Sequence, residues 1–415
     1  MDITFNSPKV KGCVRAISSK SEAHRALICA ALSDRDTKII CTDTNADIDA
    51  TVSCLNSLGA KIERTSDGFE VSPILGSLSG AVLDANESGS TLRFLLPLVA
   101  ALGSDCEFVM RGRLASRPLS PLYELLCENG VELSEAGKSH LSVSGRLCAG
   151  DYTLEANISS QYISGMLFAL SISQGKSILR LSGKIESAPY IFMTLDILKR
   201  FGAEIEFDTE SSTFYINGKK RLVSPSAFTV GGDWSNAAFQ LCAGAIGADP
   251  VTVKNLDMHS RQGDRAILSV LARMGADFEL ADGEITVSPS KLHGISIDAA
   301  DIPDLVPILS VAAAVAEGET LIYNASRLRL KESDRIESVC ATLSALGADI
   351  RETEDGMIIR GKSKLAGGSV DSFNDHRIAM SAAIASLVSE GAVTVSRFEA
   401  INKSFPTFLE NLESI

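Results

Sequence analysis

The chain has 415 residues, more than one hydrophobic core usually holds, so we expect at least two domains. Hydrophobic residues make up 45% and charged residues 22%, which is typical of folded globular proteins and excludes a disordered chain. The formal net charge of −13 argues against a nucleic-acid partner, because binding to a phosphate backbone requires a basic surface. If the substrates are anions, their site must be locally basic within an acidic protein.

The cysteine pattern and the lack of membrane or secretion signals indicate the cellular compartment of the protein. No apolar run approaches the ~20 residues that cross a bilayer, and the longest candidates, such as 306–316, are typical of buried helices. The first residues lack the basic and apolar regions of a signal peptide. Nine cysteines occur singly, without a Cys-x-x-Cys pair, which suits a reducing cytoplasm rather than zinc fingers or a disulfide framework. We therefore expect a cytoplasmic protein.

One pattern recurs along the chain with a period of about 72 residues. A helix ends at a glycine, then come Ala or Val, a short strand, a polar turn and a second strand. The glycines are 71, 72, 73 and 72 residues apart and suit the left-handed position that closes a helix: Gly59, Gly130, Gly202, Gly275 and Gly347. Five occurrences in register indicate a repeat of helix, strand, helix and hairpin.

In chain order, the first predicted elements are two strands at 3–5 and 10–16. The first helices of the copies are expected to open at 20–21, 88–90, 159–161, 233–235, 304 and 375–377. Several second helices are expected to begin near 117, 187–190, 331–332 and 403. The fifth copy is expected to have a helix at 304–316, a strand at 320–324, a helix at 332–346 and a hairpin at 350–352 and 357–359.

The sixth copy, with a strand at 392–396 and a helix at 405–412, ends without a hairpin. We interpret the two N-terminal strands as the missing piece, which puts both termini in one domain. The simplest division has three copies per domain. It consists of a discontinuous domain of residues 1–18 and 232–415, and an inserted domain of residues 19–231.

Cations gather at the predicted helix starts. A helix N-terminus binds anions because it carries unpaired N–H groups and about half a positive charge. Small polar residues there are often only helix caps, but cations oppose the helix dipole at that end and so indicate an anionic ligand. These cations are Lys20, Arg25, Arg93, Arg117, Lys331, Arg335, Arg377 and Lys403.

Two carboxylates, Asp304 and Glu332, open the two helices of the fifth copy and admit two interpretations. In the first, Asp304 caps its helix and Glu332 pairs with Arg335, three residues further on. In the second, two acids beside a cationic cleft move a proton onto and off a substrate. The sequence leaves the two interpretations equally open.

Two other patterns are set aside. Residues 356–363 match the P-loop sequence, but their interior is apolar and they lie in a predicted hairpin, not between a strand and a helix. The five histidines have no zinc-binding spacing, so we expect no metal site.

Six motifs, in order along the chain, carry a resemblance to a known family. They are Ser19-Lys20-Ser21 with Arg25, Ser159-Ser160-Gln161, Ile302-Pro303-Asp304, Lys331-Glu332-Ser333-Asp334-Arg335, Asn374-Asp375-His376-Arg377 and Lys403-Ser404-Phe405-Pro406. Together they resemble the 3-phosphoshikimate 1-carboxyvinyltransferases, the EPSP synthases of the shikimate pathway, over nearly the whole chain. The resemblance implies an α/β fold: a two-domain inside-out α/β barrel with six βαβαββ units, three per domain, that closes on its substrates.

The resemblance also implies the reaction and its site. The enolpyruvyl group of phosphoenolpyruvate would move to the 5-hydroxyl of shikimate 3-phosphate, with release of phosphate and without a metal or organic cofactor. Shikimate 3-phosphate would be held by Lys20, Ser21, Arg25, Ser159, Ser160, Gln161, Ser187, Asp304 and Lys331. Phosphoenolpyruvate would be held by Lys20, Gly89, Arg117, Gln161, Arg335, Arg377 and Lys403. In this scheme Asp304 is the base and Glu332 the acid, while Lys20 assists near the developing charge.

Some positions depart from the family pattern: Ile-Ser-Ser at 17–19 replaces Pro-Gly-Ser, His24 replaces Asn, and Glu-Ser-Gly-Ser at 87–90 replaces Asn-Ala-Gly-Thr. They bear on inhibition by glyphosate, which competes with phosphoenolpyruvate in this family, more than on activity. Two alternatives are the related UDP-N-acetylglucosamine enolpyruvyltransferase and a non-catalytic anion-binding module. The Asn-Asp-His-Arg and Ser-Ser-Gln motifs favour the shikimate enzyme, and the intact acids and cations argue against the module. We expect a monomer with no nucleic-acid or membrane partner.

Overall fold

The computed structural model describes residues 1–6, 10–76 and 79–413. The chain forms two compact units, each with its own hydrophobic core. We call Met1–Ile17 with Gly231–Ile415 the discontinuous unit, and Ser18–Val230 the inserted unit. Within the described ranges, no helix combines the length and the apolar character that crossing a membrane requires.

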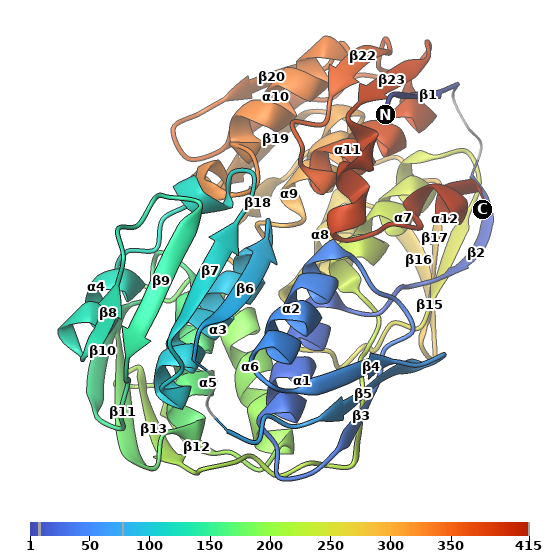
Figure 1. Cartoon of the computed structure of the whole chain (residues 1–415). Coiled ribbons are helices and arrows are strands. Elements are labelled where there is room, and N and C mark those ends of the chain that lie inside the picture. The colour runs from blue at the N-terminus through green and yellow to red at the C-terminus, as the bar shows by residue number, and fades with distance from the viewer. Residues whose placement is uncertain (7–9, 77–78, 414–415) are drawn as a thin grey trace. The chain divides into compact units, whose positions relative to one another are not determined.

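The inserted unit contains three sheets and the helices packed against them (Figure 1). Its helices are α1 (Lys20–Ala31), α2 (Ala46–Ser57), α3 (Gly89–Leu102), α4 (Leu122–Glu128), α5 (Ser160–Ile172) and α6 (Ala188–Arg200), with a 3-10 turn η1 (Leu114–Ser116). Its strands are β3 (Thr37–Ile40), β4 (Lys61–Arg64), β5 (Gly68–Ser72), β6 (Ala81–Asn86), β7 (Cys106–Met110), β8 (Val131–Leu133), β9 (His140–Gly145), β10 (Asp151–Glu155), β11 (Gly175–Ser182), β12 (Glu204–Asp208), β13 (Thr213–Gly218) and β14 (Ala227–Thr229).

Each sheet of the inserted unit has the same strand order: β14-β3-β5-β4, β6-β7-β9-β8 and β10-β11-β13-β12. The first two strands of each are parallel and the others antiparallel, which is the βαβαββ pattern expected from the repeat. In the first copy the chain supplies the parallel partner last, since β14 is the final strand of the unit and lies beside β3. Figure 1 shows α3 and α5 inside the sheets, with α4 at the outer edge beside β8 and β10, and the expected inside-out arrangement is confirmed for the buried helices of this unit.

The interior position of the first helices follows from their composition. Every residue of α5 except Gln161 is buried, as is usual for a helix that is apolar all round. A side chain at Gly165 would collide with the backbone carbonyl of Arg93, so this glycine allows α5 to pack directly on α3.

The discontinuous unit repeats this architecture. Its helices are α7 (Trp234–Ile246), α8 (Ile267–Met274), α9 (Val306–Ala314), α10 (Arg335–Ala345), α11 (His376–Ala385) and α12 (Phe408–Glu413), with 3-10 turns η2 (Gly263–Ala266), η3 (Ser326–Leu330), η4 (Ser386–Val388) and η5 (Phe398–Lys403). Its strands are β1 (Ile3–Phe5), β2 (Gly12–Arg15), β15 (Val251–Lys254), β16 (Asp277–Ala281), β17 (Glu284–Ser288), β18 (Ser296–Asp298), β19 (Glu319–Tyr323), β20 (Asp349–Glu352), β21 (Met357–Arg360), β22 (Gly368–Asp371) and β23 (Val393–Ser396).

The two N-terminal strands do not join the same sheet, which corrects one prediction. Strand β1 pairs antiparallel with β23 and completes the sixth copy, as expected. Strand β2 instead pairs in parallel with β15 and opens the fourth copy, in the sheet β16-β17-β15-β2. Because the inserted unit separates β2 from α7 in sequence, the pattern after residue 16 gave no sign of this βαβ unit.

The helix ends agree with the repeat better than the helix starts. All five glycines of the repeat have positive φ, at 96°, 86°, 73°, 94° and 89°, which confirms the predicted left-handed closures. Several second helices begin three to five residues later than expected, at Leu122, Arg335 and Phe408. In each case a 3-10 turn, η1, η3 or η5, occupies part of the segment before the helix. The residues that match the P-loop sequence include strand β21, so setting that pattern aside was correct.

Candidate functional site

In the inserted unit, three helix starts carry serine caps. Ser19, Ser88 and Ser159 accept hydrogen bonds from backbone N–H groups of α1, α3 and α5 at 3.4, 3.2 and 3.3 Å. Interpreting these serines as caps is therefore correct. Ser21 and Ser160 lie in the first turns of α1 and α5.

Two guanidinium groups lie at the start of α3. A Cβ atom built on Gly89 would be 2.7 Å from Nη1 of Arg93 and 3.0 Å from Nη1 of Arg117. Gln161 bridges this region, because its Oε1 accepts from Arg93 at 2.9 Å and its Nε2 donates to Ser90 Oγ at 3.0 Å. Close packing of α5 on α3 at Gly165, one turn beyond Gln161, brings these groups together.

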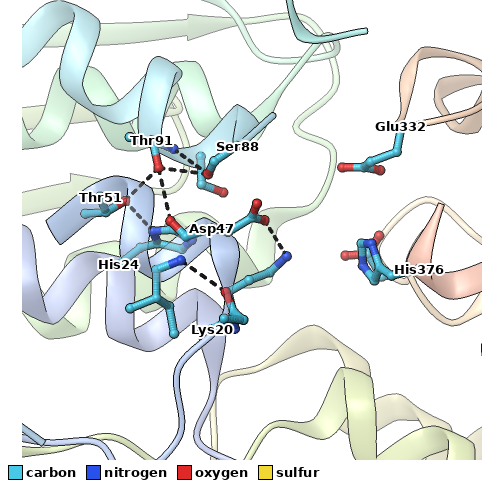
Figure 2. Close-up of polar contacts among 12 residues, drawn as sticks. Lys20, His24, Asp47, Thr51, Ser88, Thr91, Glu332 and His376 are labelled. Atoms are coloured by element: carbon cyan, nitrogen blue, oxygen red, sulfur yellow. Dashed lines mark hydrogen bonds and ion pairs between the residues drawn. The ribbon is translucent and has the colours of Figure 1, made fainter. Parts of the chain in front are cut away.

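Lys20 and Arg25 lie on α1 and differ in their contacts. Lys20 Nζ pairs with Asp47 Oδ2 of α2 at 2.7 Å (Figure 2). Arg25 is buried and donates to Thr194 Oγ1 and to the carbonyl of Ser21, both at 2.7 Å. Burial lowers the pKa of Arg25 to about 10, so the side chain remains charged at neutral pH.

Ser187 belongs to the same unit and has an unusual backbone. It is buried and caps α6 with a left-handed φ of 54°, a conformation that a non-glycine residue adopts only when its surroundings require it. One turn of α6 later, the carbonyl of Tyr190 accepts from Arg25 Nη2 at 3.2 Å. The start of α6 therefore brings Ser187 near Arg25.

In the discontinuous unit, Arg335 is the centre of a group of carboxylates. Its guanidinium donates to Asp375 Oδ2 at 2.8 Å, to Asp304 Oδ1 at 2.6 Å and to Glu332 Oε2 at 2.7 Å. Only 1% of its side chain is exposed, against 21% for Asp304 and 22% for Glu332. Burial lowers the pKa of Arg335, but the three negative charges outweigh burial and raise it above its usual value.

Asp304 is surrounded by three cations. Besides Arg335, Arg377 Nη2 lies 3.3 Å from Oδ2 and Lys331 Nζ lies 3.7 Å from Oδ1. Burial raises the pKa of Asp304, yet Arg377, Lys331 and Arg335 together hold it well below its usual value. Burial also lowers the pKa of Lys331 to about 8, so this amine can lose a proton close to neutral pH.

Helix α11 and the 3-10 turn η5 carry the remaining predicted residues, Arg377 and Lys403. Asp375 caps α11 by accepting from the N–H of Arg377 at 2.9 Å, and so fixes the start of the helix that carries Arg377. Lys403, at the end of η5, donates to the carbonyl of Asn374 at 2.6 Å. Asp375 thus joins the Arg335 group to the Asn-Asp-His-Arg motif.

The two interpretations of the acids can now be compared with the geometry. The ion pair between Glu332 and Arg335 is confirmed. The cap at Asp304 is wrong, because Leu305 is the N-cap of α9 and makes no side-chain cap bond. Asp304 instead uses its carboxylate for the three cations around it.

Sequence reasoning missed two carboxylates. Asp47 stands in no recognised motif, and only the packing of α1 on α2 brings it to Lys20. Asp264 is fully buried, accepts a short hydrogen bond from Ser235 Oγ, and feels the charges of Asp304 and Arg377. Asp264 and Glu332 both stand three residues before a second helix of the repeat, which is the signal that could have identified Asp264. Within the described part of the chain, no three His, Cys, Asp or Glu side chains form a possible metal site.

Comparison with known proteins identifies the family. The profile of the family described as EPSP synthase (3-phosphoshikimate 1-carboxyvinyltransferase) matches residues 6–412. A 3-phosphoshikimate 1-carboxyvinyltransferase of Clostridium novyi is 40% identical, over 98% of this chain and 95% of the relative. One from Clostridium acetobutylicum is 41% identical, over 100% of this chain and 97% of the relative.

A solved structure of the same family has a similar fold. EPSP synthase from Acinetobacter baumannii superposes with a TM-score of 0.81 at 26% identity, over 100% of this chain and 98% of the other. The resemblance of the six motifs and the two-domain α/β fold are thereby confirmed. The chain belongs to the EPSP synthase family.

Proposed function

We propose that the polar centres of the two units carry out the reaction of the EPSP synthase family. They are the helix starts at Lys20, Gly89 and Ser160 in the inserted unit and the group around Asp304 and Arg335 in the discontinuous unit. The chain is an enolpyruvyl transferase, which moves the 1-carboxyvinyl group of phosphoenolpyruvate to the 5-hydroxyl of shikimate 3-phosphate and releases phosphate. The observation that carries the assignment of roles is the group around Asp304, where two acids and three cations meet within 3.7 Å.

The inserted unit is proposed to hold most of the anionic groups. For shikimate 3-phosphate we assign Lys20, Ser21, Arg25, Ser159, Ser160, Gln161 and Ser187, with Asp304 and Lys331 from the other unit. For phosphoenolpyruvate we assign Lys20, Gly89, Arg117 and Gln161, with Arg335, Arg377 and Lys403 from the other unit. The charged arginines at the α3 start and beside Ser21 support this assignment, because they add positive charge to helix N-termini.

Arg335 can serve phosphoenolpyruvate only by exchanging a partner. Its three donor nitrogens each bond to a protein carboxylate. A substrate carboxylate has the same charge and geometry, so it can replace Glu332 or Asp304 at the guanidinium without leaving a buried charge unpaired. Such an exchange would also release an acid to face the reacting atoms.

The two acids are proposed to divide the proton transfers. Asp304, held ionised by its cations, accepts the proton of the 5-hydroxyl as the oxygen attacks C2 of phosphoenolpyruvate. Glu332 delivers a proton to the methylene carbon, which becomes the methyl group of the tetrahedral intermediate, and the amine of Lys20 is assigned to stabilise the charge that develops. Loss of phosphate, with return of a methyl proton to the protein, restores the double bond in the product.

A phosphate-release assay tests the function. We expect release with shikimate 3-phosphate and phosphoenolpyruvate together, and none when shikimate 3-phosphate is omitted or replaced with UDP-N-acetylglucosamine. Release with the UDP-sugar would move the chain to the related transferase, and no release under any condition would contradict the activity.

A second assay tests the acid. Glu332→Gln should still bind shikimate 3-phosphate but lose exchange of the methylene protons of phosphoenolpyruvate with solvent. Glu337→Gln, an exposed change in the first turn of α10, should retain exchange. Retained exchange in Glu332→Gln would remove Glu332 from the role. We also propose that the enzyme works as a cytoplasmic monomer, which size-exclusion chromatography and cell fractionation would check.

A further inference from the structure

The histidine that precedes Arg25 lies inside the inserted unit. His24 is 1% exposed, with its Nδ1 2.7 Å from Thr51 Oγ1 of α2 and its ring edge against Phe94 of α3. Its Nε2 has no hydrogen-bond partner among the described residues. Burial, followed by the charges of Lys20 and Arg25, holds the pKa of His24 well below its usual value, so the ring is neutral.

A chain of hydrogen bonds leads from His24 to the start of α3 (Figure 2). Thr51 Oγ1 lies 2.7 Å from Thr91 Oγ1, and the Thr91 hydroxyl donates to Ser88 Oγ at 2.8 Å. Ser88 is the cap of α3 and also accepts from the N–H of Thr91. All three hydroxyl side chains are fully buried, so water does not replace these bonds.

The number of available protons determines which group is the donor in each of these hydrogen bonds. Each hydroxyl has one proton to donate. The one proton of Thr91 is directed to Ser88 Oγ and, at the longer distance of 3.4 Å, to the carbonyl of Asp47. Thr51 must therefore donate to Thr91, and the proton between His24 and Thr51 must come from Nδ1 of the ring. The neutral ring is therefore protonated at Nδ1 and is the donor that begins the chain.

The chain ends where the proposed phosphoenolpyruvate site begins. Ser88 directly precedes Gly89 and Ser90, and Ser90 accepts from Gln161 at 3.0 Å. Thr91 also lies 3.4 Å from the carbonyl of Asp47, whose carboxylate pairs with Lys20. The buried chain thus connects α1 and α2 to the segment that approaches Arg93 and Arg117.

We propose that His24 is a positioning residue, whose Nδ1–H orients the Thr51–Thr91–Ser88 chain and thereby holds Gly89 and Ser90 for phosphoenolpyruvate. The proposal rests on the function proposed above only for the identity of the ligand. His24 touches no substrate in this role. It acts through the start of α3, so its loss should weaken binding of phosphoenolpyruvate and leave binding of shikimate 3-phosphate unchanged.

Steady-state kinetics with two substitutions tests the proposal. His24→Leu keeps an apolar side chain in the pocket but cannot donate, whereas His24→Asn places an amide N–H where Nδ1 lies. We expect KM for phosphoenolpyruvate to rise about tenfold in His24→Leu, equivalent to ~1.4 kcal/mol, and to stay within about threefold of the parent in His24→Asn. KM for shikimate 3-phosphate should change less than about twofold in both. His140→Leu, which changes an exposed side chain at the start of β9, is the matched control and should change neither KM.

Substitutions at Thr51 interrupt the same hydrogen bonds at a second position, and so show whether the effect at position 24 is only a folding defect. Thr51→Val removes the middle hydroxyl and Thr51→Ser retains it, so only Thr51→Val should raise KM for phosphoenolpyruvate. The double variant His24→Leu/Thr51→Val should be no worse than the more affected single variant, because both interrupt one chain. Equal losses for both substrates, or additive losses in the double variant, would overturn the proposal.

Hydrogen exchange separates this proposal from the function itself. In the absence of substrate, amides of a peptide covering 88–92 should exchange faster in His24→Leu than in the parent or in His24→Asn. Unchanged exchange there would contradict the chain even if the enzyme is active. An inactive parent protein with faster exchange in His24→Leu would leave the chain intact and contradict only the assigned ligand.

Discussion

The polar centres of the two units have the same place in the repeat but different electrostatics. In the inserted unit, Arg25 donates to a hydroxyl and to backbone carbonyls, Arg93 donates to the amide oxygen of Gln161, and Lys20 pairs with the carboxylate of Asp47. In the discontinuous unit, Arg335 bonds to three carboxylates, and Asp304 also faces Arg377 and Lys331. We call the first the cationic centre, after the lysine and arginines at its helix starts, and the second the compensated centre, after the three carboxylates around Arg335.

We propose that this difference divides the reaction between the two units. A cationic helix start binds anions without changing their protonation. A compensated group of acids and bases costs more to bury, but it holds Asp304 ionised and places acids where protons can move. The comparison predicts that substitutions in the inserted unit act mainly on KM, whereas those in the discontinuous unit act on stability and kcat.

The largest effect is expected from breaking the compensated centre. Arg335→Met leaves three carboxylates without their shared cation, and loss of one partner from a buried ion pair costs ~3–5 kcal/mol. Urea unfolding should show a loss of this size. Arg360→Met, which breaks an exposed pair with Glu319 in the same unit, should cost less than ~1 kcal/mol. Equal losses in both variants would mean that the buried group contributes no more than a surface pair.

Asp304→Asn tests the chemical role of the same centre. Removing a general base lowers kcat by about 10²–10⁴-fold, and the amide keeps the size of the side chain. The phosphate-release assay should show that loss with a cooperative unfolding transition still present. Asp349→Asn, at the exposed start of β20, should leave kcat within about twofold. A kcat in Asp304→Asn close to that of the parent would assign the base elsewhere.

Asp264 makes the discontinuous unit sensitive to pH. Burial and the charge of Asp304 raise its pKa to about 6 in the folded protein, above the ordinary value of 3.8. The folded state therefore binds more protons than the unfolded state between these values, so this contribution to stability is complete below pH 3.8 and is lost as pH rises through 6.

Asp264→Asn should remove that pH dependence. Relative to the parent, the variant should gain roughly 2 kcal/mol of stability between pH 4.5 and 7.5, as measured by urea unfolding at both values. A stability difference that does not change with pH would show that Asp264 has an ordinary pKa. Asp282→Asn, in the exposed turn between β16 and β17, serves as the control.

The smallest effect is expected from the cationic centre. In Gly89→Ala the new methyl group would press on the guanidinium of Arg93 at 2.7 Å and on that of Arg117 at 3.0 Å. Both groups end flexible side chains and can move, so we expect normal stability and a KM for phosphoenolpyruvate raised about tenfold. Gly76→Ala, with open space around the added atom, should not change KM. A fall in stability without a change in KM would contradict the anion-binding role of this helix start.

Local chemistry explains which parts of the fold could be predicted. The glycine at each helix end is a local requirement of backbone geometry, and all five closures were found from spacing alone. The partner of β2 was missed because the whole inserted unit separates β2 from β15 in sequence. Several helix starts were placed early because Arg117 and Lys331 lie in irregular segments between a 3-10 turn and the next helix, where residue type does not fix the first helical residue.

The candidate site also has features that the sequence predicted and features that only the packing of the helices determined. Motifs identified the family and singled out the candidate cations and acids, since residue type and order are properties of the chain itself. Packing alone determined that Asp47 meets Lys20, that Asp264 is buried beside Ser235, and that His24 begins a chain ending at Ser88. Such contacts join separate helices, so they exist only once those helices are folded against each other, and their strength comes from the exclusion of water.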